Sequence, residues 1–169
     1  MSIVVETGAG LTNADSSCSV AAADAYFTNL GNTSWTGSTS VKEDALKVAT
    51  QYIELRFGTR WFGVKKTQEQ SLSWPRQDVT TRDDFEVSDT SVPTAVVNAT
   101  AEMALRSIQG DVFMADVSTP GSISEYEVKV GPIAEKTKYL GGQSSTKAYP
   151  KLEAMLADLA SALNEIKRA

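Results

Sequence analysis

"SVKEDALKVATQYIELRFG", residues 40–58, carries the clearest helix signal in the chain. Ser40 and Glu43 match a capping box, in which each side chain bonds the other's backbone N–H at a helix start. Apolar side chains then recur at helical spacing, and Gly58 follows them as a terminator. The expected buried stripe comprises Ala45, Val48, Ala49, Tyr52, Ile53 and Phe57. The stretch therefore predicts a long amphipathic helix over residues 40–57.

Three further helices are expected from the same kind of signal. Ser19 can cap a helix over residues 19–30, which Gly31 would end. Pro93 suits the first turn of a helix over 92–109, and Pro150 lies near the start of one over 149–168. The helix over 92–109 has many small residues, which would let a neighbouring helix approach closely. The pattern predicts a mainly α protein with a four-helix bundle-like core.

Between the second and third of these helices runs a long, mostly irregular segment, residues 59–91. One or two helical turns are expected over residues 65–72, and a small hairpin turning at 82–84. "SLSWPRQDV" holds Trp74, Pro75 and Arg76, a rigid tripeptide with a large apolar body and a five-donor fork. With Trp61 and Phe62, these residues are candidate anchors. Two interpretations stay open, an internal anchor on the helical core, which is favoured, and a contact with another subunit.

A β-hairpin is expected over residues 123–139, in the C-terminal half. Tyr126, Val128 and Val130 alternate with charged residues, Gly131-Pro132 marks a turn, and Ile133 begins the return arm. Tyr126, Val128, Val130 and Ile133 are therefore candidate contact residues. With this hairpin included, the whole chain, residues 1–169, is expected to form a single domain.

Composition excludes several classes of function. The 169 residues carry 16 basic and 21 acidic side chains, a net charge of −5, which argues against a general nucleic-acid binder. The chain has no histidine, and its acidic residues read as solvated surface, so we expect no catalysis, metal or cofactor. Cys18 precedes a helix start, where the dipole could lower its pKa, although a small residue in a loop is the simpler interpretation. No signal peptide or membrane span is expected.

"LRFGTRWFGVKK", residues 55–66, interleaves basic and aromatic residues. Arg56, Arg60, Lys65 and Lys66 lie among Phe57, Trp61 and Phe62, as on surfaces that stack single-stranded nucleic acid. The alternative is that the three aromatic side chains anchor the core and the cations are solvated around them. The acidic total favours this second interpretation.

The order of the segments resembles the adaptor, or head-completion, proteins of tailed bacteriophages. The resemblance rests on "VVETGAGLTNADS", "SVAAADAYFTNLGNTSWTG", "KEDALKVATQYIELRFG", "SLSWPRQDV", "VPTAVVNATAEMAL" and "EKTKYLGGQSSTKAYPKLEAML", which span nearly the whole chain. Some members of that family are labelled DnaT-like single-stranded-DNA-binding proteins. None of these segments is a catalytic signature, so the resemblance lies in the order of patterns.

The resemblance implies a structural role without catalysis. Such proteins form a homo-oligomeric ring, commonly of twelve subunits, between the portal protein and the tail, stopper or tail-terminator protein. DNA passes through the ring without sequence-specific binding, and the protein, made in the host cytoplasm, lies at the head–tail junction of the virion. The alternative function is a single-stranded-DNA-binding accessory protein of a replication complex.

Overall fold

The computed structural model describes residues 2–111, 113, 125–130, 133–138 and 149–162. Contacts gather in two compact units, residues 1–112 with 149–169 and residues 113–148, which are described separately. The first holds helices α1 (Val20–Asn29), α2 (Thr39–Phe57), α3 (Thr94–Ile108) and α4 (Pro150–Leu156), and the second holds a β-hairpin. The prediction of a mainly α protein with a hairpin is confirmed. The single domain over 1–169 stays a prediction.

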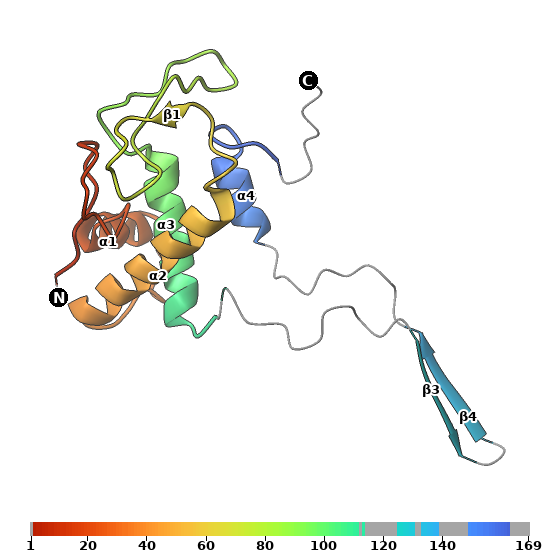
Figure 1. The fold of residues 1–169 in the computed structure, drawn as a ribbon. Coiled ribbons are helices and arrows are strands. Elements are labelled where there is room, and N and C mark those ends of the chain that lie inside the picture. Colours follow the sequence, from red (N-terminus) through yellow and green to blue (C-terminus); the bar gives the residue numbers. More distant parts are fainter. Residues whose placement is uncertain (1, 112, 114–124, 131–132, 139–148, 163–169) are drawn as a thin grey trace, which may run out of the picture. The chain divides into compact units, whose positions relative to one another are not determined.

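Helix α3 is the central element of the first unit and contacts each of the other three helices (Figure 1). Its small residues Ala99, Ala101 and Ala104 are buried, as the close approach of neighbouring helices requires. Its buried face also includes Leu105, whereas Ile108 at its last turn is only half-buried. The small residues of α3 were expected to admit a neighbouring helix, and α3 packs against all three of the others.

A buried carboxylate on α3 ties three helices together. The hydroxyl of Tyr26 on α1 donates to Glu102 Oε1 at 2.9 Å, and Lys151 Nζ on α4 contacts the same oxygen. Burial, followed by the hydrogen bond to Glu102, raises the pKa of Tyr26 to about 12. Tyr26 therefore keeps its proton and remains a donor to Glu102 at neutral pH.

Helix α2 begins earlier than the sequence predicts. Ser38 is the N-cap: its backbone is extended, its hydroxyl accepts from Val41 N at 3.4 Å, and its carbonyl accepts from Lys42 N. The predicted capping box of Ser40 and Glu43 is wrong, because Ser38 is the N-cap and already accepts from a free backbone N–H of the first turn. Val48, expected on the buried stripe, is exposed, and Leu46 and Thr50 are buried in its place.

Helix α4 is much shorter than the predicted 149–168. It ends at Leu156, and residues 159–161 pair with residues 60–62 across a bridge between Trp61 and Ala160. Phe62 N donates to Leu159 O at 3.0 Å, and Ser161 N donates to Arg60 O at 2.9 Å. The backbone groups that a longer helix would use are committed to this pairing. Residues 163–169 lie outside the described part of the chain.

The middle segment packs over one end of the helices (Figure 1) and contains the short antiparallel strands β1 (Val64–Lys65) and β2 (Arg76–Gln77). The helical turns expected over residues 65–72 do not form, because the Gln70 side chain bonds the backbone there: it accepts from Thr67 N and donates to the carbonyls of Leu72 and Pro75. The small hairpin is confirmed. Thr80 bridges to Glu86, and Asp84 at the turn has a φ of 61°.

The hairpin of the second unit consists of β3 (Glu125–Val130) and β4 (Ile133–Lys138). Its register places Val130 opposite Ile133, Val128 opposite Glu135 and Tyr126 opposite Thr137. The predicted hairpin is confirmed at the level of the backbone. The turn residues 131–132 and the side chains of the four candidate contact residues lie outside what the structure describes.

Candidate nucleic-acid interface

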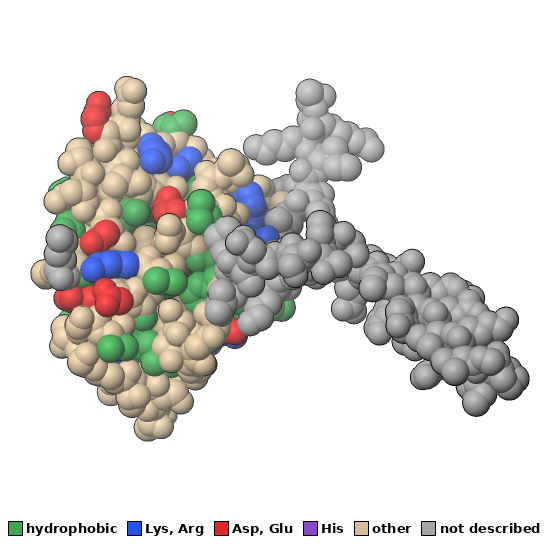
Figure 2. Space-filling view, turned by 60° about the horizontal axis from the view of Figure 1, so that its bottom comes forward, with side chains coloured by type: hydrophobic (Ala, Val, Ile, Leu, Met, Phe, Trp, Pro, Cys, Tyr) green, Lys and Arg blue, Asp and Glu red, His purple; other side chains and the backbone are tan. Residues whose placement is uncertain are grey.

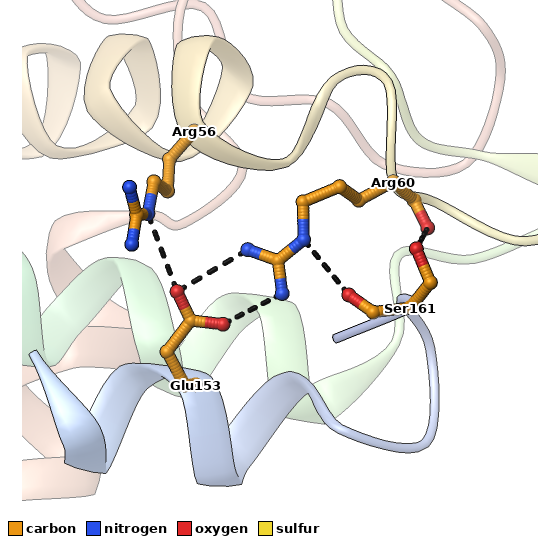
Figure 3. Close-up of polar contacts among 4 residues, drawn as sticks. All are labelled: Arg56, Arg60, Glu153 and Ser161. Carbon is orange, nitrogen blue, oxygen red and sulfur yellow. Dashed lines mark hydrogen bonds and ion pairs between the residues drawn. The ribbon is translucent and has the colours of Figure 1, made fainter. Parts of the chain in front are cut away.

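Arg60 is bound through three of its nitrogens. Nη1 and Nη2 bond the two carboxylate oxygens of Glu153 on α4 at 3.2 and 2.7 Å, and Nε donates to the carbonyl of Ser161 at 2.8 Å (Figure 3). Arg56 Nε donates to the same carboxylate at 3.2 Å. The guanidinium of Arg60 also lies over the ring of Phe57, 4.4 Å from its centroid. Both predicted DNA-contacting arginines thus join the end of α2 to α4.

The carboxyl group of Glu153 lies in an environment that favours its charged form. Burial alone would raise its pKa, but the hydrogen bonds and charges of Arg60 and Arg56 outweigh burial, so the pKa lies below its ordinary value. No local pattern marks Glu153 as a partner of these arginines, because they lie more than 90 positions away in the chain.

This arrangement makes part of the stability dependent on pH. A depressed folded-state pKa contributes stability above the ordinary carboxyl value, and that contribution is lost as the pH falls through the folded-state pKa. We expect Glu153→Gln to lower the free energy of unfolding at pH 7 by about 1–2 kcal/mol. The difference from the parent protein should shrink by pH 3 in urea unfolding. A difference that is the same at both values would contradict the ion-pair account.

The aromatic residues of this region form a packed core rather than a stacking surface. Phe57 and Trp61 lie with ring centroids 5.3 Å apart, and Trp61 packs edge-on against Trp74 at 5.7 Å. All three rings are buried. Phe62 is half-buried, and it is the one aromatic of the 55–66 stretch with a partly accessible side chain.

The two lysines of the stretch differ in their surroundings. Lys66 Nζ donates to the carbonyls of Gly8 and Asp89 at 3.2 and 2.9 Å, so it ties the first part of the middle segment to the N-terminal loop and to the last part of the same segment. Lys65 is exposed, with a contact of 3.4 Å from Nζ to the carbonyl of Gln70. Of the four basic residues, Lys65 is the one exposed on the surface.

Trp74, Pro75 and Arg76 are all buried within the first unit. The Trp74–Pro75 peptide bond is cis. Arg76 donates from Nε to the carbonyl of Phe62 at 2.6 Å, from Nη2 to that of Gly63 at 2.7 Å and from Nη1 to that of Ser73 at 3.2 Å. Burial lowers the pKa of Arg76, and the nearby charge of Glu54 opposes this effect. These contacts are those of an internal anchor.

The glycine-rich N-terminal loop binds its own carboxylate. Glu6 is buried and accepts hydrogen bonds from the backbone N–H groups of Gly8, Gly10 and Leu11 at 2.8, 3.0 and 2.7 Å. Backbone N–H groups gathered in this way often bind phosphate. Here Glu6 occupies them, so the loop offers no free anion site.

Cys18 is 1% exposed, and its thiol donates to the carbonyl of Ser19 at 3.3 Å. Burial raises the pKa of Cys18 to about 12 and outweighs the lowering by the backbone N–H of Ala23 at the start of α1. The net shift is therefore opposite to the lowered pKa considered from the sequence.

We expect the Cys18 thiol to react with an aromatic disulfide reagent at pH 8 at least about 100-fold more slowly in the folded protein than in urea, because both access and thiolate are withheld. The absorbance change of the released thiolate reports the rate. Equal rates in the two conditions would contradict the burial of Cys18.

The described surface mixes charges of both signs. On the face shown in Figure 2, acidic and basic side chains are interspersed, and hydrophobic side chains lie between them. Within the described residues, no group of three or more acidic or cysteine side chains could hold a metal ion. In the same residues, no helix has the length and apolar character needed to cross a membrane.

Fold and contacts together define a mainly α protein whose basic and aromatic residues mostly hold segments of the chain together. By sequence, the chain belongs to the family described as "Putative DnaT-like ssDNA binding protein", whose model matches residues 1–169. No curated protein and no solved structure matches the chain.

The family match corrects the main functional prediction. A structural adaptor between phage head and tail is overturned, because the matching family is described by single-stranded DNA binding. The family description favours the alternative of the sequence analysis, single-stranded-DNA binding. The homo-oligomeric ring, the portal and tail partners and the location in a virion depended on the adaptor interpretation and stay untested predictions.

Proposed function

We propose that this protein binds single-stranded DNA, as an accessory protein without a catalytic role. The observation that carries the proposal is the family match over the whole chain. The charge of the protein sets how such binding would behave. With a net charge of −5 and few exposed cations among the described residues of its first unit, it would contact few phosphates.

The test is fluorescence anisotropy with a labelled oligothymidine of about 20 nucleotides, compared with a duplex of the same length. We expect saturable binding to the single strand at low salt and weaker binding to the duplex. The logarithm of the binding constant should fall with the logarithm of salt by about 0.7 for each phosphate neutralised. Absence of binding at low salt, or equal binding to both forms, would contradict the proposal.

A further inference from the structure

A pocket of about 550 Å³ opens in the first unit where three segments meet. One wall is the end of α2 with the residues that follow it, the second is the turn around Thr81, and the third is α4 with its continuation. The pairing of residues 60–62 with 159–161 fixes two of these walls relative to each other. Pockets of this size suit small ligands, and one nucleotide is within the range.

The lining of the pocket combines apolar side chains with two arginines. Phe62, Ala157 and Ala160 line it, and Phe62 is the half-buried aromatic of the region. Arg60 is also in the lining, but Glu153 and the Ser161 carbonyl already hold its guanidinium. The pocket therefore has a fixed guanidinium within and space beside an aromatic side chain.

Arg82 is the cation that is available to a ligand. Its side chain is 77% exposed, and its ion pair with Asp158 is long, 3.7 Å from Nη2 to Oδ1, with both partners in solvent. Such a pair is worth little, and a phosphate group can take the place of the carboxylate with better geometry. Asp83 and Asp84 follow Arg82 in the turn but do not line the pocket.

We propose that this pocket holds one unstacked nucleotide of a single strand, with its base against Phe62 and its phosphate on Arg82. The inference rests on the proposed function, and it locates single-strand binding at this pocket. The charges support one nucleotide rather than a tract. Arg60 and Arg82 face Glu153 and Asp158 in the lining, so the pocket has no excess of cations for a long phosphate backbone.

Three variants test the assignment by anisotropy with the labelled oligothymidine. Arg82→Ala should weaken binding about three- to tenfold and reduce the salt slope by about 0.7, because one phosphate contact is lost. Asp158→Asn should tighten binding, because it removes the carboxylate that competes for Arg82. Lys65→Ala is the matched control: it removes an exposed positive charge outside the pocket and should weaken binding less than Arg82→Ala. Unchanged unfolding midpoints would show that all three variants are folded.

A direct readout comes from an oligonucleotide that carries 5-iodo-deoxyuridine, cross-linked by ultraviolet light and mapped by peptide mass. We expect an adduct at Phe62. If the parent protein binds the strand but Arg82→Ala binds equally well and adducts lie only elsewhere, the pocket is not the site, although the proposed function stands. If the parent protein does not bind single strands at all, the proposed function fails and this inference falls with it.

Discussion

Replacing Trp74 with alanine is expected to lower the free energy of unfolding by about 3–5 kcal/mol. The side chain is 1% exposed and packs edge-on against Trp61, which in turn packs on Phe57 at the end of α2. Truncation would leave a large cavity between the middle segment and the helices, which adds to the lost burial of the indole. Equilibrium unfolding in urea, followed by tryptophan fluorescence and far-ultraviolet circular dichroism, measures the effect.

Two further variants separate packing from general sensitivity to substitution. Trp74→Phe keeps an aromatic ring and removes an indole N–H that has no hydrogen-bond partner among the described residues, so it should cost less than half as much as alanine. Phe85→Ala alters a side chain that is 72% exposed and should stay within about 0.5 kcal/mol of the parent. Similar losses for Trp74→Ala and Phe85→Ala would show that Trp74 is not the internal anchor.

The sequence predicts well where local signals decide. Ser19 caps α1, and Gly31 has a φ of 64° directly after that helix, both as expected from residue type. The small residues of α3 indicated close packing, and alternation indicated the hairpin of β3 and β4. In each case the information lies within a few residues of the position concerned, so a single sequence contains it.

The sequence predictions fail where backbone or side-chain groups bond to residues that are far away in the chain. Leu159 would continue the apolar stripe of α4, but its carbonyl instead accepts from Phe62 N, some 100 positions earlier. Periodicity cannot reveal such pairing. The basic and aromatic residues of 55–66 likewise have the composition of a stacking surface. In the structure, however, the two arginines bind Glu153 and Trp61 packs against Trp74. The sequence does not mark Arg82 as a candidate contact residue, because a single arginine in a turn matches no binding pattern.

Loss of Arg76 is expected to be the second large effect on stability. Arg76 as a residue is 8% exposed, and its guanidinium donates to the carbonyls of Phe62, Gly63 and Ser73. Phe62 and Gly63 directly precede β1, and Ser73 lies three residues before Arg76, the first residue of β2. Arg76 therefore ties β2 to the residues that lead into β1. No ion pair under 4 Å to a carboxylate is found for Arg76 within the described residues, which leaves the three carbonyls as its main partners.

We expect Arg76→Met to lower the free energy of unfolding by about 2–4 kcal/mol, because a side chain of similar length would leave three buried or partly buried carbonyl acceptors without their donors. Arg76→Lys should lose an intermediate amount, because one ammonium group cannot reproduce the fork that reaches carbonyls on two segments. The matched control is Arg82→Met, at an exposed arginine, which should change stability by less than about 0.5 kcal/mol. If Arg76→Met and Arg82→Met lower the free energy of unfolding equally, the cost of burying the Arg76 charge must cancel what its three hydrogen bonds contribute. That result would refute the anchoring role of Arg76.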